Sequence, residues 1–456
     1  MELELLRKTE PSAPSNAGRL ERDGLQRRYE AVRHTTAWLC EPLTVEDCVI
    51  QSAMECSPVK WQLAHTTWFF ETFVLLPNDP SYREFHPTFS YLFNSYYNAV
   101  GDRTPRDIRG LMSRPTLAEV WNYRDYVDRA MNNFFQRASE DVMRRTVPII
   151  VLGINHEQQH QELIVTDVKT VLAMNPLRPI YRAREIIAAP VNPIEWISFD
   201  EGLFEFGAET SQIQKINPEN PHHPRNPGSF FFDNEGPRHR SYLESFQLAN
   251  RLITNGEYKQ FMADGGYQTP SLWLSDGWAR VLEEKWRAPK YWDENDGEWW
   301  AMTLQGFRPV EDSEPVTHLS HYEADAFATW ANARLPTEFE WELAAQNQPI
   351  EGNFLEDSNF HPVPSVLAVS LVPGSSPRQM FGDVWEWTRS AYLPYPGFSA
   401  VEGAIGEYNG KFMSNQMVLR GGSCATPRDH IRATYRNFFP PGSRWQFSGI
   451  RLARHV

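Results

Sequence analysis

The sequence predicts an α+β protein with two domains, a helix bundle followed by a domain of short strands and helices. Three observations lead to this prediction. The chain has 456 residues, enough for more than one hydrophobic core. Apolar residues in its first part recur three and four positions apart, as on helices with one buried face. Its second part has short apolar runs between Gly and Pro and many tryptophans, which is typical of an irregular α+β domain.

Changes in this pattern divide the chain into four regions. Residues 1–24 alternate charged residues with Pro, Ser and Gly, so we expect a flexible N-terminus. Residues 25–174 carry the helical pattern. Residues 175–194 contain four prolines and no consistent period, which indicates a linker. Residues 195–456 then form the second domain.

The clearest helices of the first domain are predicted for residues 117–135 and 147–172, where the helical period is sustained. Thr116 followed by Glu119 has the form of a capping box, which sets the start of one helix. Between Ser81 and Pro115 the period breaks among aromatic residues, Gly and Pro. We expect a long ordered loop there, and such loops often carry function.

Composition excludes several classes of partner. The formal net charge of −14 argues against a surface that binds nucleic acid, which needs clustered Lys and Arg. The N-terminal residues lack the apolar core of a signal peptide, and no run of about 18 apolar residues predicts a membrane helix. We therefore expect a cytoplasmic protein with small-molecule partners, and the oligomeric state stays open.

The few cysteines show no Cys-x-x-Cys pairing, which fits a reduced compartment. They are expected to be small buried residues: Cys40, Cys48, Cys56 and Cys424.

The most informative segment is Asn155–Leu163, where His156 and His160 are four residues apart. On a helix these side chains lie about 40° apart, so both rings can reach one metal ion. The best third ligand is His65, a single imidazole within an apolar helical pattern, because helices of a bundle commonly share metal sites. Three neutral imidazoles suit Fe(II) oxygen chemistry or catalytic Zn(II), and the residues alone do not decide which.

The same segment matches His-Glu-x-x-His, the signature of zinc proteases. In that interpretation Glu157 is the general base, and Glu185 in the proline-rich linker is the available third ligand. Glu157 and Gln159 lie about 80° on either side of the metal-facing line, so helix geometry does not decide which is functional. The remaining candidate histidines are expected to be surface or structural residues: His34, His86, His222 and His223.

The second domain contains five ordered motifs: Asp233–His239, Ile253–Tyr258, Arg334–Glu342, Gly382–Thr388 and Arg420–Ser423. Together they resemble the formylglycine-generating (sulfatase-modifying) domain, which has a C-type-lectin-like α+β fold. Their expected role is scaffold, through core aromatics and buried ion pairs such as Arg334 with Glu340, Trp385 and Trp387. That domain's own activity uses a cysteine pair, whereas only Cys424 follows the Arg-Gly-Gly-Ser motif here.

The combination of this domain with a DinB-like four-helix bundle that carries the three histidines resembles the sulfoxide synthases of ergothioneine biosynthesis. The resemblance implies a nonheme Fe(II) enzyme that uses O2 to join a thiol to C2 of the imidazole of hercynine (trimethylhistidine). It also implies that His65, His156 and His160 are the iron ligands. The product would be a sulfoxide.

The resemblance also implies a hercynine site. Gln159 would contact hercynine, and the run Asn437, Phe438 and Phe439 would form its pocket from the second domain. Aromatic rings attract a quaternary ammonium, and amides can bind a carboxylate or an imidazole nitrogen. The alternative for this run is a packed interdomain loop.

Three further features bear on the thiol substrate. Family members that use γ-glutamylcysteine place an Asp and an Arg just after this Asn, whereas residues 439–444 here lack the Asp, which favours cysteine. Tyr96 and Tyr97 resemble the active-site tyrosines of the cysteine-using branch, where a phenol can supply a proton. Arg103 and Arg106 either hold the cysteine carboxylate or form surface ion pairs. Related donors or acceptors, namely γ-glutamylcysteine, histidine or a selenium compound, and a noncatalytic binding module remain as alternatives.

Overall fold

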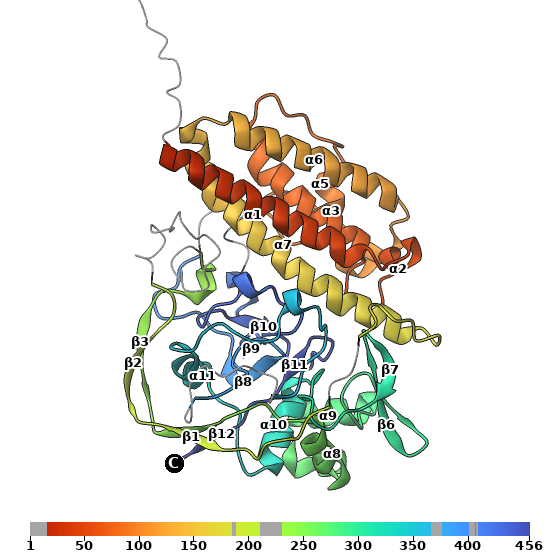
Figure 1. Cartoon of the computed structure of the whole chain (residues 1–456), viewed down its shortest axis with the longest axis vertical. Helices are drawn as coiled ribbons and strands as arrows, with labels where there is room; N and C mark the ends of the chain where they lie inside the picture. Colours follow the sequence, from red (N-terminus) through yellow and green to blue (C-terminus); the bar gives the residue numbers. More distant parts are fainter. Residues whose placement is uncertain (1–15, 185–187, 210–229, 366–375, 401–405, 407–408) are drawn as a thin grey trace, which may run out of the picture.

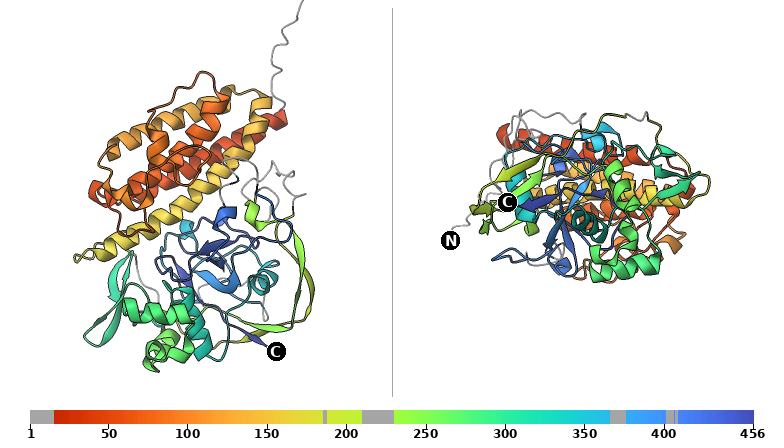
Figure 2. Two further views of the ribbon diagram at one scale, coloured as in Figure 1. Left: turned by 180° about the vertical axis from the view of Figure 1, so that it is seen from behind. Right: turned by 90° about the horizontal axis from the view of Figure 1, so that it is seen from below.

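The molecule consists of a bundle of long helices stacked on a strand-rich part (Figure 1). The computed structural model describes residues 16–184, 188–209, 230–365, 376–400, 406 and 409–456. The predicted roles of Glu185, His222 and His223 lie outside these residues. Seen from behind, helix α7 (Glu140–Met174) lies between the two parts (Figure 2). This helix therefore contributes to both.

Helix boundaries in the bundle follow local sequence signals. The predicted capping box is confirmed, because Thr116 accepts a hydrogen bond from the backbone N–H of Glu119, whose side chain accepts one from the backbone of Thr116. Helix α7 begins after Ser139, whose hydroxyl caps the N–H of Val142. The helices are α1 (Asn16–Cys40), α2 (Val45–Val49), α3 (Val59–Phe70), α4 (Leu76–Asn78), α5 (Phe89–Phe93), α6 (Leu117–Arg137) and α7, with a π-helical turn at Glu71–Leu75 and a 3-10 turn at Arg106–Leu111.

Helix α3 is the centre of the bundle. All 12 of its residues are buried, so it is covered on every side, mainly by α6 and α7. Gly153 of α7 allows the close approach of these helices, since a Cβ atom there would lie 2.6 Å from the ring of Phe70 and 2.8 Å from that of Phe69. The glycine precedes His156 by three residues. It thus brings the histidine face of α7 against α3.

The strand-rich part contains several small sheets. The four-stranded sheet has the order β10-β9-β8-β11, and three-stranded sheets have the orders β1-β4-β12 and β5-β6-β7, with β2 paired to β3. The elements are β1 (Trp196–Phe199), β2 (Gly202–Phe206), β3 (His239–Leu243), β4 (Phe246–Ala249), α8 (Asn255–Ala263), α9 (Ser275–Glu284), β5 (Trp292–Asn295), β6 (Glu298–Thr303), β7 (Gly306–Pro309), α10 (His321–Trp330), α11 (Glu338–Ala345), β8 (Trp385–Ala391), β9 (Met417–Arg420), β10 (Asn437–Phe439), β11 (Ser448–Gly449) and β12 (Ala453–His455).

The motif residues of the second domain are structural, as expected. Arg334 pairs with Glu340 at 2.6 Å, and Trp385 and Trp387 are almost fully buried. All four cysteines are free and buried, which confirms their predicted role. No helix within the described ranges is long and apolar enough to cross a membrane.

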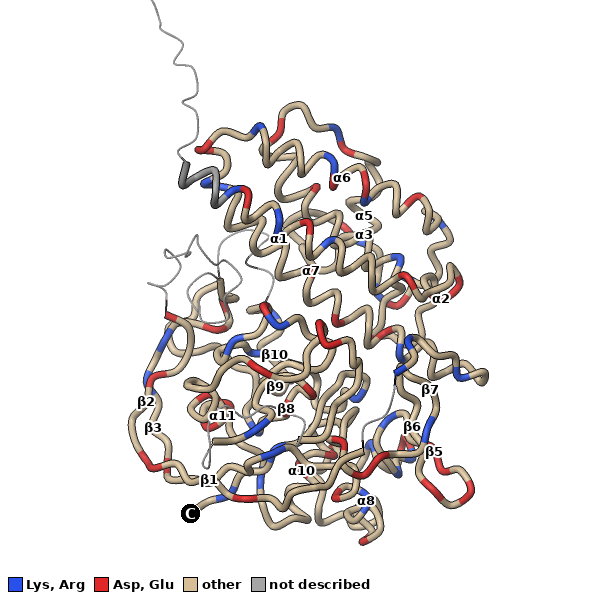
Figure 3. Tube along the Cα trace, in the orientation of Figure 1, with Lys and Arg blue, Asp and Glu red and all other residues tan. Residues whose placement is uncertain are grey.

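Basic and acidic residues are interspersed over both parts of the molecule (Figure 3). The distribution of charged residues along the chain trace therefore does not single out one element as a site. Buried polar groups are more informative, because a polar group inside a protein needs a partner or a function.

Candidate metal centre

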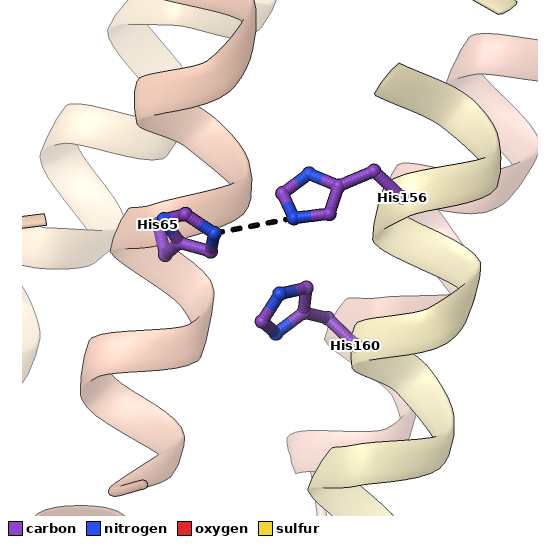
Figure 4. A group of neighbouring side chains, drawn as sticks. All are labelled: His65, His156 and His160. Atoms are coloured by element: carbon purple, nitrogen blue, oxygen red, sulfur yellow. Dashed lines mark hydrogen bonds between the residues drawn. The ribbon is translucent and has the colours of Figure 1, made fainter. Parts of the chain in front are cut away.

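Three buried histidines converge between α3 and α7 (Figure 4). His65 comes from α3, and His156 and His160 come from successive turns of α7. Their ring centres form a nearly regular triangle, with separations of 4.9, 4.9 and 4.7 Å. One ligand atom from each lies within 4.8 Å of the others. Within the described part of the chain, this is the one group of three or more His, Cys, Asp or Glu side chains gathered in this way.

The spacing of the ring nitrogens fits a shared ion. Nε2 of His65 lies 3.1 Å from Nε2 of His156. Two nitrogens bound in neighbouring positions of one ion, each about 2.1 Å from it, would lie about 3.0 Å apart. The residues present therefore fit a metal held by three imidazoles.

Burial keeps the three imidazoles neutral, which metal binding requires. Burial lowers the pKa of His156 to about 3. It also lowers the pKa values of His65 and His160 well below the usual value, and the neighbouring histidines lower them further. Each imidazole thus keeps one ring nitrogen with a lone pair that can bind a metal at neutral pH.

Contacts on the outer side of the rings orient them. Nδ1 of His65 lies 2.6 Å from the carbonyl oxygen of Phe93, to which it must donate. The same ring lies between two tryptophans, with centroid distances of 4.6 Å to Trp61 and 5.5 Å to Trp68. Nδ1 of His160 lies 3.1 Å from Oε1 of Gln62. Both rings therefore present Nε2 to the centre.

Glu157, the base of the protease interpretation, points into the bundle away from this centre. It accepts hydrogen bonds from Arg33 at 2.9 Å, Arg124 at 2.5 Å and Thr36 at 2.7 Å. Burial raises its pKa, but the two guanidinium groups outweigh this effect and lower the pKa to about 2. Glu157 is therefore a partner of buried arginines and is unsuited to accept a proton at neutral pH.

Gln159 faces the second domain. Its Nε2 donates to the hydroxyl of Tyr435 at 2.7 Å, and this hydroxyl lies 3.0 Å from Nε2 of His430. Nδ1 of His430 lies 3.1 Å from Oδ1 of Asn155, back on α7. A chain of polar side chains thus runs from α7 to the second domain and back. Tyr435 precedes Asn437 by two residues, so the chain places Gln159 beside the start of β10.

The predicted pocket residues of β10 are half-buried at the same junction. Phe438 stacks on Tyr392, with ring centres 4.0 Å apart, and lies 5.8 Å from Phe412. Phe412 in turn lies 5.3 Å from Tyr96 of the long loop. Asn437 accepts the N–H of Phe438 at 2.9 Å. Phe439 completes the run, with its ring 5.2 Å from that of Trp445.

The two tyrosines of the loop lie side by side, with ring centres 5.2 Å apart. Tyr97 is fully buried and packs against Trp68 at 5.6 Å, which itself stacks on His65. Tyr96 is half-buried and contacts the second domain through Phe412. The ring of Tyr97 is thus separated from His65 by Trp68, and Tyr96 lies on the far side of Tyr97, against the second domain.

Arg103 and Arg106 lie at the surface of the loop, apart from the histidines. Arg103 donates to Asn98 at 2.6 Å, and Arg106 donates to the carbonyl of Glu55. Sequence reasoning missed Arg109, which is only 6% exposed and lies 3.5 Å above the ring of Trp61. Its Nη1 donates to Ser57 at 3.1 Å, and no ion pair joins it to a carboxylate of the described residues.

Arg109 is thus a buried cation beside the histidines. Burial, together with Arg106 and Arg103, lowers its pKa to about 9. The signal in the sequence is a repeat of arginines at every third position, of which the 3-10 turn Arg106–Leu111 directs the last inward. The regular spacing alone does not show which of the three arginines is buried.

Glu162 of α7, also missed, joins the two parts of the molecule. It accepts hydrogen bonds from Trp385 at 2.7 Å, Ser423 at 2.7 Å and Thr426 at 2.8 Å. Ser423 belongs to the Arg-Gly-Gly-Ser motif, in which Gly421 and Gly422 have positive φ angles of 96° and 81°. The motif thus forms the loop that receives α7.

The protein thus combines a helix bundle that carries a three-histidine centre with an irregular α+β domain. This combination defines its class. The sequence profile of the sulfatase-modifying factor enzyme 1-like domain matches residues 184–365 and 377–456, and that of the DinB superfamily matches residues 28–164. The chain belongs to the family that carries the sulfatase-modifying factor enzyme 1-like domain. These matches confirm the predicted fold class.

One relative matches this chain across both of its parts. The chain is 29% identical over 432 residues to the hercynine oxygenase of Mycolicibacterium thermoresistibile, covering 88% of each chain. It is 36% identical over 247 residues to the hercynine oxygenase of Mycolicibacterium smegmatis, covering 49% of this chain and 56% of that one. The corresponding match in Mycobacterium tuberculosis is 36% identical and covers 48% and 55%. These relatives confirm the predicted resemblance.

Proposed function

We propose that this protein is a hercynine oxygenase, a nonheme Fe(II)-dependent sulfoxide synthase of ergothioneine biosynthesis. It would couple C2 of hercynine to the sulfur of cysteine with O2 and give hercynylcysteine sulfoxide. The observation that supports this most strongly is the neutral three-histidine centre beside the domain junction. The relatives named hercynine oxygenase support the same reaction class.

The reaction balances without another cofactor. The C2–H and S–H bonds break, and a C–S bond and an S–O bond form. Formation of the C–S bond releases two electrons and oxygenation of sulfur releases two more, which together reduce O2. One oxygen atom enters the sulfoxide, and the other leaves as water with the two hydrogens.

His65, His156 and His160 would hold the iron, leaving positions for other ligands. The bound Fe(II) would supply a site that lowers the pKa of the thiol and activates O2. Gln159 and the run Asn437, Phe438 and Phe439 would hold hercynine at the junction. The aromatic rings suit its trimethylammonium group.

Arg109 is a better candidate than Arg103 or Arg106 for the cysteine carboxylate. It is buried next to the layer of Trp61 and His65, whereas the other two are exposed. A buried guanidinium without an ion pair is suited to a carboxylate ligand. Tyr96 or Tyr97 would donate or accept the proton at a phenol oxygen.

The surroundings of Arg444 support cysteine over γ-glutamylcysteine. Arg444 pairs with Glu323 at 2.7 Å and lies 4.3 Å above the ring of Trp286. Its guanidinium is thus already engaged within the protein. The glutamyl part of γ-glutamylcysteine would therefore find no Asp at this position, and the Arg that is present is already bound to Glu323.

The test is anaerobic loading with Fe(II), followed by O2 with hercynine and either cysteine or γ-glutamylcysteine. We expect a product with the mass of hercynine plus cysteine, plus one oxygen and minus two hydrogens. His65→Ala should lose iron and product together, whereas His34→Ala, at an exposed histidine of α1, should retain both. Absence of a sulfoxide with either thiol from iron-loaded protein would overturn the proposal.

A further inference from the structure

Behind His160, away from the other two histidines, lies a buried polar chain that includes Gln62 and Asp167. Gln62 is 1% exposed and Asp167 is 3% exposed. Nε2 of Gln62 donates to Oδ2 of Asp167 at 2.8 Å and to the carbonyl of Ser57 at 3.4 Å. The backbone N–H of Ser57 donates to the same Oδ2 at 3.0 Å.

Two acceptors set the direction of these hydrogen bonds: the carbonyl of Ser57 and, at the shorter distance of 2.8 Å, Oδ2 of Asp167. A backbone carbonyl can only accept, so the end of the Gln62 amide that faces it must be the NH2 group. The other end is then the carbonyl oxygen, which can only accept. It lies 3.1 Å from Nδ1 of His160, so this nitrogen must carry the proton. The lone pair is left on Nε2, which faces the centre.

Protonation of Asp167 does not reverse the direction of these hydrogen bonds. Burial raises the pKa of Asp167 to about 7, so its charge changes near neutral pH. Oδ2 already receives two N–H groups, from Ser57 and Gln62. A proton on the carboxyl group therefore belongs on Oδ1, away from Gln62. The amide keeps its orientation with either form.

We propose that Asp167 and Gln62 are positioning residues that hold His160 in its Nδ1–H tautomer and so prepare its Nε2 for the metal. This inference rests on the proposed metal centre and adds the groups that orient one of its ligands. If the amide were free to turn by 180°, its NH2 group would face His160 and favour the other tautomer. That tautomer has a proton on Nε2, which prevents metal binding.

The first test measures the tautomer itself in apo-protein labelled with 15N at histidine. Multiple-bond 1H–15N NMR correlations distinguish Nδ1–H from Nε2–H. We expect Nδ1–H for His160 in the wild type and in Asp167→Asn, since an Asn oxygen can accept both N–H groups. Gln62→Met and Asp167→Leu should populate the Nε2–H form. A wild-type His160 with its proton on Nε2 would overturn the inference.

The second test measures affinity for Co(II) and Fe(II) by anaerobic titration of the full chain without substrates. Loss of a group that hydrogen-bonds to a metal-binding histidine typically weakens metal binding by about 10- to 100-fold. We expect a loss of this size for Gln62→Met and Asp167→Leu. Asp167→Asn should stay within about threefold of the wild type.

The matched control is Gln161→Met, because Gln161 is equally buried on α7 but bonds to Val32 and Thr36 instead. It should retain wild-type affinity. Unchanged affinity in Gln62→Met and Asp167→Leu would contradict the inference. If the wild type binds no metal, the proposed function fails, while the NMR result still decides the orientation of His160.

Discussion

Two carboxylates of α7, Glu157 and Glu162, are both buried but meet opposite environments. Glu157 faces the bundle and pairs with Arg33 and Arg124. Glu162 faces the second domain and accepts only neutral donors, including Trp385 and Ser423. Burial raises the pKa of both, but the arginines reverse this for Glu157 alone.

The difference shows how one helix serves two purposes. Ion pairs inside the bundle hold α7 in the register that places its histidines against α3. Neutral hydrogen bonds join the same helix to the Arg-Gly-Gly-Ser loop, so the second domain lies against the helix that carries two of the three histidines. Substitutions of Glu157 and of Glu162 therefore test the two faces of α7 separately.

The largest effect is expected for Glu157→Ala. The substitution leaves Arg124 buried without its carboxylate and leaves Arg33 with one carboxylate partner, Asp128. Removing one partner of a buried pair costs about 3–5 kcal/mol of unfolding free energy. Urea denaturation followed by circular dichroism measures it. Asp125→Ala, which breaks an exposed pair with Arg129, should cost about 0.3–0.5 kcal/mol. Equal effects of the two variants would contradict the role of Glu157.

A smaller effect is expected for Glu162→Ala at the junction. Its three donors lose their acceptor inside the protein, at a cost of about 1–3 kcal/mol. Glu162→Gln retains an acceptor oxygen and should recover most of the stability. Denaturation monitored by tryptophan fluorescence measures both variants. Destabilisation by Glu162→Gln as large as that by Glu162→Ala would argue against hydrogen bonding as the cause.

The stability contributions of the two carboxylates should depend on pH with opposite sign. Glu157 has a lowered pKa, so its contribution is present above the unfolded value of about 4.3 and is lost as pH falls toward 2. Glu162 has a raised pKa, so its contribution is present below that value and is lost as pH rises through the folded pKa. Denaturation of Glu157→Gln, Glu162→Gln and wild type between pH 3 and 8 measures this. Trends of the same sign would disprove the contrast.

The smallest effect is expected for Gln159→Ala. Loss of one hydrogen bond to hercynine should weaken its binding by about two- to tenfold and leave iron content unchanged. Isothermal titration of metal-loaded protein with hercynine measures the affinity. Gln158→Ala is the matched control, since Gln158 bonds to Asp429 at the same junction. Equal weakening in both variants would indicate a general effect on the junction.

Local sequence patterns predicted the features that depend on neighbouring residues. The spacing of His156 and His160, the capping box at Thr116 and the periods of the long helices all arise within a few residues of backbone. His65 was also predicted, because the His156 and His160 pair requires a third ligand and helices of a bundle commonly share metal sites. Its place opposite the pair depends on the close approach at Gly153.

The sequence by itself determined two domains, three candidate metal ligands and a family resemblance. Tertiary structure alone decided the partners of the other polar residues, because those partners come from distant segments. Glu157 meets Arg33 across 124 residues, and Gln62 meets Asp167 across 105. Arg109, and not Arg106, is buried because a 3-10 turn directs it inward. Burial and charge depend on what surrounds a group in space, and spacing along the chain does not report this.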